Sequence, residues 1–393
     1  MMAKLGLVIT QVRGVSYSPK DLHDSLNDES IILLRANNIK DGKINFDDVV
    51  YIDKKKVNKN QYLCRGDVLI CTSSGSKELV GKAAFFSENT IATFGAFCKV
   101  IRPSIPCKEF IGHFFNSPFY RREISSLSSG ANINNIRNEH IDNLEMNLPT
   151  ENIQEAITRR LNFVNSLIES RQKQLSKLDQ LVKSRFIEMF GDVYLNTMSW
   201  DEKDLESIAD IVSGITKGRK VKNKKLKEVP YMAVSNVKDG YIDWSTVKKI
   251  DVTDEEISRY RLLKDDVLIT EGGDPDKVGR GAIIKNPLEN CIHQNHIFRV
   301  RLNKLIVLPV FFAEYLQHQK SKRYFLSCAK QTTGIASINM KQLKSLPVLL
   351  PPIKLQRQFS DFIQQVEKAK LSVKQSLDKL ETLKKSLMQE YFG

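Results

Sequence analysis

The chain has 393 residues, which exceeds one compact core and fits two to four structural units. Its formal net charge of +14 favours a polyanionic partner, although charge alone does not separate DNA, RNA and a membrane surface. The sequence has no run approaching about 18 apolar residues and no secretory apolar segment near its start, so we expect a cytoplasmic protein that does not enter a membrane.

The cysteine and histidine pattern predicts neither a disulfide framework nor a metal site. The six cysteines form no C-x-x-C pair, and the six histidines fall in no ligand spacing beside them. We therefore expect a reduced, metal-free protein. The cysteines are Cys64, Cys71, Cys98, Cys107, Cys291 and Cys328.

The most informative feature is an internal repeat, in which the second half of the chain resembles the first at an offset of roughly 200 residues. In its first block, residues 33–52 match residues 231–250. Both segments have an asparagine, Asn38 or Asn236, shortly before a Lys-Asp-Gly turn. Apolar runs on both sides of that turn predict a strand, a turn and a second strand in each copy.

Two more blocks follow in the same order in both halves. Residues 66–70 match residues 265–269, and their apolar runs predict buried strands that lead into Gly-rich loops. Residues 128–136 match residues 332–339 as polar stretches, each of which runs into an apolar segment that stops at a proline.

The last block predicts a long helix after each domain, at residues 151–191 and 353–393. The segment 177–184 recurs at 379–386, and both helices end in Phe-Gly. Apolar residues at alternating three- and four-residue steps form a seam that is typical of a coiled coil. About 35 residues at ~1.5 Å each give either helix a length on the order of 50 Å, so we expect both to act as spacers. The seam residues are Leu161, Ile168, Leu175, Leu178 and Val182 in the first helix and Ile363, Val366, Val373, Leu377, Leu380 and Leu387 in the second.

Chain order sets the direction of the two helices. The first helix leaves domain one and ends at domain two, so the second must run back along it and the pair is antiparallel. Similar antiparallel helices have a pseudo-two-fold axis, so we expect the domains to face a common ligand in opposite orientations, and duplex DNA has that symmetry. Arg171, Lys370 and Lys384 interrupt the seams, which argues against a long independent coil.

The predicted fold class is therefore α+β with a pseudo-two-fold internal repeat. Two globular mixed α/β domains, at residues 1–150 and 192–352, alternate with two long helices that pair as an antiparallel coiled coil.

Taken together, these blocks resemble the specificity (S) subunits of type I restriction-modification systems. The resemblance rests on the Asn-containing block with its Lys-Asp-Gly turn, the Gly-Asp-Val-Leu-Ile block, and helices that end in Phe-Gly, duplicated in order over essentially the whole chain. It implies two target-recognition domains, each of which reads one half of an asymmetric split DNA site. It also implies as partners double-stranded DNA, two methyltransferase (M) subunits that bind S-adenosylmethionine, and restriction and motor (R) subunits that use ATP and Mg²⁺.

We find no catalytic or cofactor-binding signature in the sequence. The segment from Gly75 to Ala83 has five residues between its glycines where a phosphate loop needs four, and Ala where Mg²⁺ would require Ser or Thr. An Asn-Pro-Pro-Tyr methyltransferase motif is also missing, since Asn286-Pro287-Leu288 stops short. We therefore expect a non-catalytic DNA-reading subunit that binds no cofactor. A coiled-coil adaptor for other proteins and an enzyme with an unrecognised site are the alternatives.

The strongest candidate for phosphate contact is the basic stretch 217–227, which has no acidic residue. Contacts of this kind position DNA without reading its sequence. The alternative is a solvated loop that keeps the protein soluble. The corresponding part of the first domain is less basic, and the nearest substitute there for the basic stretch is Lys54, Lys55, Lys56 and Lys59. The candidates in the basic stretch are Lys217, Arg219, Lys220, Lys222, Lys224 and Lys225.

Base reading is expected from the polar loops, because Asn, Ser, Thr and Lys side chains hydrogen-bond base edges. The alternative is turn chemistry, which favours several of the same residue types. The candidates are Ser73, Ser74, Lys77, Asn132, Asn134 and Asn135 in the first domain and Thr332, Thr333, Ser337, Asn339 and Lys341 in the second.

Two further groups of side chains bear on DNA contact. Acidic residues in the second Gly-rich loop would repel phosphate, so they either accept from a cytosine amino group or stand off the DNA. They are Glu271, Asp274 and Asp276. Four aromatic residues lie in strand-like segments, and we expect them in the core rather than as stacking platforms. They are Phe94, Phe97, Tyr231 and Trp244.

Overall fold

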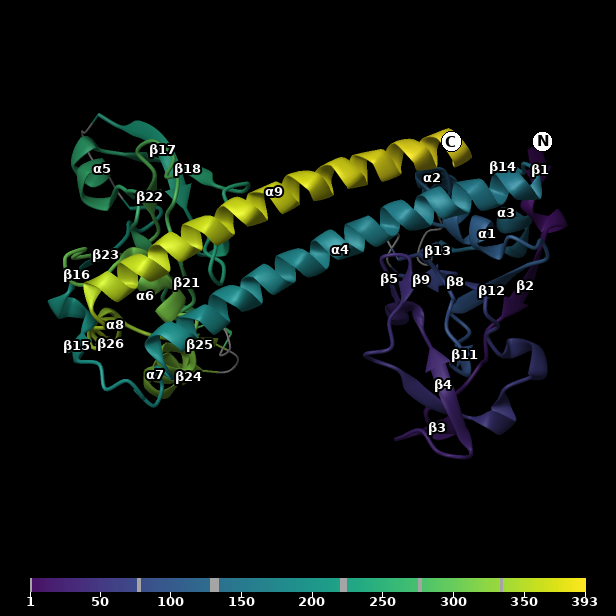
Figure 1. Ribbon diagram of the computed structural model, residues 1–393, viewed down its shortest axis with the longest axis horizontal. Coiled ribbons are helices and arrows are strands. Elements are labelled where there is room, and N and C mark those ends of the chain that lie inside the picture. Colours follow the sequence, from purple (N-terminus) through teal and green to yellow (C-terminus); the bar gives the residue numbers. More distant parts are fainter. Residues whose placement is uncertain (1, 76–78, 128–133, 220–224, 275–277, 333–334) are drawn as a thin grey trace. The chain divides into compact units, whose positions relative to one another are not determined.

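The structure is a computed structural model that describes residues 2–75, 79–127, 134–219, 225–274, 278–332 and 335–393. The chain divides into two compact units, which Figure 1 shows with their elements labelled. Unit 1 consists of Met1–Lys173 and Lys374–Gly393, and unit 2 consists of Gln174–Val373. Each of the two long helices therefore contributes one part to each unit.

Unit 1 is built on a six-stranded sheet of order β2-β12-β8-β10-β6-β5 and a four-stranded sheet of order β11-β4-β7-β3. Its strands are β1 (Met2–Lys4), β2 (Ile9–Arg13), β3 (Leu22–His23), β4 (Ser30–Leu34), β5 (Ile39–Lys40), β6 (Lys43–Ile44), β7 (Val50–Asp53), β8 (Val68–Cys71), β9 (Ser73–Ser74), β10 (Ala83–Phe85), β11 (Ala92–Phe94), β12 (Cys98–Pro103), β13 (Asn134–Asn135) and β14 (Glu145–Asn147). Its helices are α1 (Lys108–Phe114), α2 (Pro118–Leu127), α3 (Asn138–Asp142) and parts of α4 (Glu151–Phe190) and α9 (Ile353–Phe392).

Strand β8 shows why a continuous apolar run predicts a strand buried on both faces. All four of its residues are at most 1% exposed. Val68 and Ile70 pack in a cluster with helix side chains such as Phe110. Leu69 and Cys71 belong to a second cluster, which includes residues of β4 and β11. Because helices cover one face and a sheet covers the other, every position of β8 requires an apolar side chain.

Unit 2 has sheets of order β16-β23-β19-β21, β18-β17-β22, β20-β25-β24 and β15-β26. Its strands are β15 (Glu202–Asp204), β16 (Ala209–Ser213), β17 (Lys227–Met232), β18 (Lys248–Val252), β19 (Val267–Thr270), β20 (Gly272–Gly273), β21 (Gly281–Ile283), β22 (Ile292–His293), β23 (Ile297–Leu302), β24 (Lys330–Thr332), β25 (Ile335–Ser337) and β26 (Pro347–Leu349). Its own helices are α5 (Asp254–Tyr260), α6 (Pro309–Tyr315), α7 (Gln319–Cys328) and α8 (Met340–Lys344).

The two units repeat one sheet order. The order β2-β12-β8-β10 of unit 1 corresponds to β16-β23-β19-β21 of unit 2, and β11-β4-β7 corresponds to β22-β17-β18. A buried aspartate follows the same pattern, since Asp67 pairs with Arg102 at 2.7 Å and Asp266 pairs with Arg301 at 2.7 Å. The prediction of two similar mixed α/β domains joined to two long helices is confirmed.

The repeated asparagine has a structural role in both units. Asn38 and Asn236 are at most 1% exposed. Asn38 Oδ1 accepts a hydrogen bond from the backbone N of Arg35 at 2.8 Å, and Asn236 Oδ1 accepts one from the backbone N of Ala233 at 2.9 Å. These bonds hold a 3₁₀ turn after β4 and after β17, which the expected strand, turn and strand pattern did not include.

Helices α4 and α9 run antiparallel within each unit. In unit 1, near the start of α4, Arg160 Nη1 donates to Tyr391 Oη at 3.2 Å near the end of α9. In unit 2, Asp179 Oδ1 on the later part of α4 lies 2.6 Å from Lys370 Nζ on the earlier part of α9. Lys370 interrupts the predicted seam, and this ion pair accommodates its charge.

The predicted seam residues divide by burial into two groups. Leu161, Ile168, Val182, Val366 and Val373 are buried. The others are half-buried, namely Leu175, Leu178, Ile363, Leu377, Leu380 and Leu387. Leu178 and Ile363 pack against the core of unit 2, and Leu387 packs against the core of unit 1. The helices are thus covered partly by the folded units and partly by each other.

Candidate nucleic-acid interface

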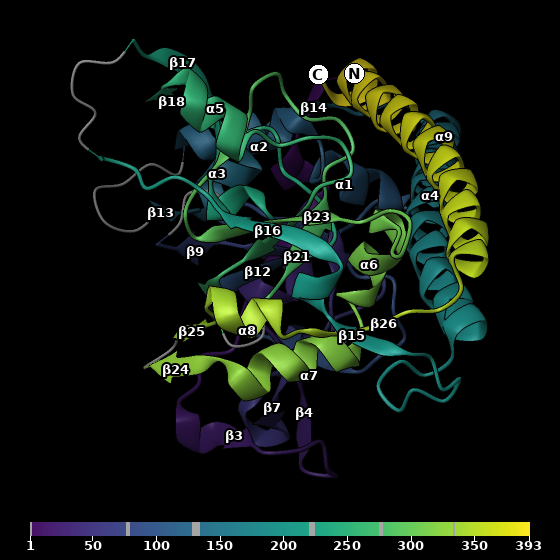
Figure 2. The same cartoon turned by 90° about the vertical axis from the view of Figure 1, so that its left-hand side faces the viewer.

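In unit 1, two loops that the sequence offered as separate candidates lie side by side. Strands β9 and β13 pair antiparallel, with Asn134 opposite Ser74 and Asn135 opposite Ser73. Beyond that pair, the backbone N of Ile136 donates to Thr72 O at 2.9 Å. Asn135 is exposed, and the two serines are half-buried. These short strands, labelled in Figures 1 and 2, form one polar strip, which we call the unit 1 strip.

Unit 2 has the corresponding arrangement, which we call the unit 2 strip. Strand β20 pairs with β25, so that Gly272 lies opposite Ser337. Strand β24 pairs with the other side of β25 through Thr332 and Ile335, and Figure 2 labels both of these strands. The backbone N of Ile338 donates to Glu271 O at 2.8 Å. The pairing therefore brings together the Gly-rich loop and the polar stretch of the second domain.

Phe97 stands beside the unit 1 strip and not in the core, so the expectation for this residue was wrong. The residue is 71% exposed. Between β11 and β12 the chain makes a turn, in which the backbone N of Cys98 donates to Gly95 O at 2.8 Å. This turn interrupts the alternation of inward and outward side chains along the strands, so Phe97 points outward. The backbone N and Oγ1 of Thr72 donate to Phe97 O at 2.9 and 3.1 Å.

The other three aromatic residues are covered. Phe94 and Tyr231 are buried, at 0% and 4% exposure. Trp244 is partly buried against a small cluster in unit 2. None of these three offers a free ring face comparable to that of Phe97.

Glu271, the first acidic residue of the Gly-rich loop of unit 2, is engaged within the protein. Glu271 Oε2 lies 2.6 Å from Nδ1 of His296, and Nε2 of His296 lies 3.3 Å from Nδ2 of Asn295. The backbone N of Glu271 also donates to His296 O at 3.0 Å. Glu271 is therefore held by a neighbouring side chain. Asp276 lies outside the described residues.

A buried lysine, which the sequence did not single out, supports the unit 1 strip. Lys99 Nζ donates to Gln11 Oε1 at 2.8 Å and to Asn138 Oδ1 at 2.6 Å. Gln11 Nε2 in turn donates to Asp142 Oδ1 at 2.7 Å. Burial lowers the pKa of Lys99. This network ties β12 to β2 and α3 and so fixes the segment that follows β13. A single lysine within an apolar strand carries no signal that sequence reasoning could have used.

The described part of the basic stretch has two different kinds of side chain. Lys217 and Lys225 are exposed. Arg219, in contrast, forms an ion pair with Glu256, to which its Nε donates at 2.6 Å, and its Nη2 donates to Asp251 O at 3.2 Å. The charge of Arg219 is therefore compensated by an acid outside the stretch.

Several candidates fall outside the described residues, and for two others only the backbone is described. Outside are Lys77, Asn132, Lys220, Lys222, Lys224 and Thr333. The two with a described backbone alone are Asn134 and Thr332.

The first domain has no equally basic stretch, and the lysines suggested there for phosphate contact lie on the surface of unit 1. Lys54, Lys55, Lys56 and Lys59 are exposed. Lys56 Nζ lies 2.9 Å from Asp21 Oδ1. Hydrogen bonds from the Ser18 backbone and from Lys56 hold the pKa of Asp21 well below its usual range. Part of this positive charge is therefore already paired.

Asn339 begins helix α8. Its Oδ1 accepts from the backbone N of Gln342 at 2.9 Å, and Gln342 Oε1 accepts from the backbone N of Asn339 at 2.8 Å, which is a capping box. The side-chain oxygen of Asn339 therefore serves the helix. Lys341 in the first turn is exposed, and Ser337 in the unit 2 strip is half-buried.

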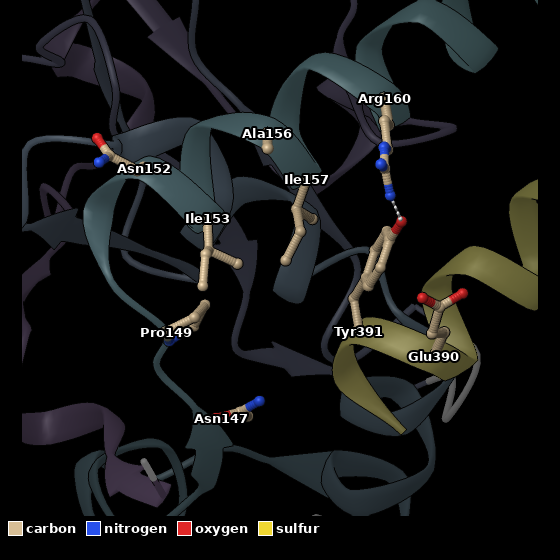
Figure 3. Close-up of a pocket in the computed structure, with 9 residues that line it drawn as sticks. All are labelled: Asn147, Pro149, Asn152, Ile153, Ala156, Ile157, Arg160, Glu390 and Tyr391. Carbon is tan, nitrogen blue, oxygen red and sulfur yellow. Dashed lines mark hydrogen bonds between the residues drawn. The ribbon is translucent and has the colours of Figure 1, made fainter.

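Figure 3 shows a pocket of about 440 Å³ on the helix side of unit 1. The start of α4 and the end of α9 line it, and the hydrogen bond between Arg160 and Tyr391 crosses its side. Apolar residues such as Ile153 and polar residues such as Asn147 both line it. None of the predicted DNA-binding residues lies in this pocket.

The described part of the chain offers neither a membrane-spanning helix nor a metal centre. Within these residues, no helix combines the length and the apolar character that a membrane crossing requires. In the same residues, no cluster of three or more His, Cys, Asp or Glu side chains is arranged to hold a metal ion.

Comparison with known proteins places the chain in a family. The family described as the type I restriction modification DNA specificity domain matches residues 9–180 and 198–382. The EcoKI specificity subunit of Escherichia coli strain K12 is 29% identical, over 100% of this chain and 88% of its own length. The StySPI specificity subunit of Salmonella potsdam is 28% identical, over 99% of this chain and 88% of its own.

A solved structure agrees at the level of the fold. The S subunit of a type I restriction-modification system from M. genitalium superposes with a TM-score of 0.56 at 15% identity, covering 100% of this chain and 96% of that one. Because the family match includes both halves of the chain, the protein belongs to the family of type I restriction-modification DNA specificity subunits.

Proposed function

We propose that this chain reads the DNA target of a type I restriction-modification complex, with each repeated domain reading one half of a split asymmetric site. In this proposal residues 1–150 and 192–352 are the target-recognition domains. Residues 151–191 and 353–393 separate the domains and dock the methyltransferase subunits. The observation that carries the proposal is the duplicated fold with a short pair of strands at the same place in each copy, β9 with β13 and β20 with β25.

The chain is the specificity subunit of such a system and not its catalytic part, as the full-length similarity to the EcoKI and StySPI specificity subunits indicates. On this proposal S-adenosylmethionine belongs to two methyltransferase subunits, and ATP and Mg²⁺ belong to the restriction and motor subunits. Family membership also disfavours the alternative of a protein-binding adaptor, which would have no use for a DNA specificity domain.

The two kinds of candidate residue would make different contacts. Exposed lysines such as Lys217 and Lys225 would contact phosphates, which adds affinity for any duplex. Asn135, exposed on the unit 1 strip, would contact base edges, where a bidentate contact gives about 1–3 kcal/mol of discrimination between bases.

The test is a salt titration of binding to a random duplex by the complex assembled with methyltransferase subunits. Replacing Lys220, Lys222, Lys224 and Lys225 by Ala should weaken binding to all duplexes alike and reduce the salt slope by about 1 for each phosphate that is no longer neutralised. The recognised sequence should not change.

Two single substitutions provide a matched control for that experiment. Lys225→Ala removes an exposed charge, whereas Arg219→Ala removes a charge that Glu256 already compensates. Lys225→Ala should therefore lower the salt slope of DNA binding more than Arg219→Ala does. If the fourfold variant binds random DNA with the parent's slope, the basic stretch serves solubility and the phosphate assignment is wrong.

A further inference from the structure

The turn before β12 and the turn before β23 present different side chains at equivalent positions. Cys98 pairs with Cys71 in unit 1, and Ile297 pairs with Thr270 in unit 2, so the residues just before them correspond. These residues are Phe97 and His296. The matching backbone bonds, from Thr72 N to Phe97 O and from Glu271 N to His296 O, measure 2.9 and 3.0 Å. Three positions therefore match across the repeat, namely Thr72, Ala96 and Phe97 in unit 1 and Glu271, Asn295 and His296 in unit 2.

The chemistry of these positions is opposite in the two units. In unit 2, the Asn295 amide donates to Nε2 of His296, which leaves Nδ1–H to donate to Glu271 at 2.6 Å, so the three side chains form a hydrogen-bonded cluster. In unit 1, the corresponding site presents the phenyl ring of Phe97, a residue that is 71% exposed, and this ring has no hydrogen-bonding atom.

Both sites adjoin the two strips directly. Ser73 N donates to Phe97 O at 3.3 Å, and Ser73 is paired with Asn135 across the unit 1 strip. In unit 2, Glu271 immediately precedes Gly272, which is paired with Ser337. A duplex that lies on either strip would therefore meet the neighbouring turn as well.

We propose that this position determines specificity in both domains, with Phe97 reading an apolar base edge and the Glu271, His296 and Asn295 cluster reading a polar one. The proposal rests on the proposed function and adds the kind of group that is read. The apolar group that the major groove offers is the C5-methyl of thymine, since the other base edges there present hydrogen-bond donors and acceptors. The half-site read by unit 1 therefore contains a thymine whose methyl packs on Phe97.

The test measures binding of the assembled complex to its mapped target with single thymines, on either strand, replaced by deoxyuracil, which lacks only that methyl. The parent should lose about fourfold in affinity at one thymine of the unit 1 half-site, the change expected for one buried methyl-sized group. Phe97→Ala should bind the thymine and uracil duplexes equally, and Phe97→Leu should keep part of the difference.

Controls separate this proposal from the proposed function. Ile91→Ala removes another exposed apolar side chain of unit 1, at 70% exposure, and should leave the thymine preference unchanged. His296→Ala should alter discrimination only in the other half-site. The specificity proposal is overturned if no uracil replacement in the unit 1 half-site affects the parent, or if Phe97→Ala weakens all duplexes equally, as removal of an inserted wedge would. Failure of the parent complex to bind DNA with sequence preference would instead contradict the proposed function.

Discussion

At the scale of single residues, His293 shows how one environment is filled differently in the two units. It is completely buried, its Nδ1 donates to Ile297 O at 3.1 Å, and its Nε2 has no hydrogen-bond partner among the residues described. Burial, with a smaller contribution from the charge of Arg299, lowers the pKa of His293 to about 4. Phe94 occupies the corresponding position of unit 1 and is also completely buried.

We predict that this histidine makes unit 2 sensitive to acid. Because its pKa is about 6.5 when unfolded and about 4 when folded, the unfolded chain binds more protons between these values. The free energy of unfolding should therefore fall as pH decreases from about 6.5 to about 4, by at most about 3 kcal/mol. Above about pH 7, where His293 is neutral in both states, the titration of His293 should not change the free energy of unfolding.

Urea unfolding at several pH values, followed by the fluorescence of Trp200 and Trp244 in unit 2, measures this dependence. His293→Phe, which copies the residue of unit 1, should flatten the curve in that window whatever its effect on stability at pH 7. His293→Asn provides a second neutral variant. If the free energy of unfolding of both variants depends on pH as steeply as that of the parent, other groups cause the acid sensitivity.

At the scale of elements, each long helix ends on an equivalent aromatic cluster. In unit 1, Phe392 at the end of α9 lies 5.2 Å from Phe110 of α1, between ring centroids. In unit 2, Phe190 at the end of α4 lies 4.8 Å from Phe311 of α6. The repeated Phe-Gly ending of the helices thus anchors each helix end in a folded unit.

We predict that Phe392→Ala destabilises unit 1 by about 3 kcal/mol, because it removes a buried ring and leaves a cavity. Chemical denaturation of the full chain should show this loss, with Phe190→Ala having a comparable effect on unit 2. Glu390→Ala, which changes an exposed residue in the same turn of α9, is the matched control. Equal stability of Phe392→Ala and Glu390→Ala would show that the end of α9 is not anchored.

At the scale of the whole molecule, the repeat predicts the behaviour of a half-molecule that ends after Gly191. This fragment keeps residues 1–173 of unit 1 but loses the part of α9 that covers it. Phe190 ends α4 in the same way as Phe392 ends α9. The α4 helix of a second copy is therefore the nearest substitute for the missing part of α9. Two identical antiparallel helices give an isologous dimer with a true two-fold axis.

With methyltransferase subunits present, this dimer should recognise an inverted repeat of the half-site read by unit 1, so that an asymmetric target becomes palindromic. Mapping the sites methylated with the truncated subunit tests the prediction. Phe190→Ala in the fragment should weaken dimerisation, measured by sedimentation. An unchanged asymmetric target would contradict the division of reading between two domains, and a soluble, partner-bound fragment without methylation would contradict interchangeable helices.

The sequence by itself determined the features that depend on local pattern and on duplication. Apolar steps of three and four residues predicted the two long helices, because one face of a helix must be covered. The continuous apolar run of β8 predicted a buried strand. The matched order of the blocks predicted the repeated fold and, through the family resemblance, the class of protein.

Only the tertiary structure decided which polar residues are available to a ligand. Arg219 is compensated by Glu256 and Asn339 is used as a helix cap, although both belonged to plausible binding stretches. Phe97 is exposed although its neighbours in the strands are buried. The reason is that periodicity reports which face of an element is apolar, whereas ion pairs, caps and turn geometry depend on which distant segments come together. Arg219 and Glu256 are separated by 37 positions in the chain, and no local pattern relates them.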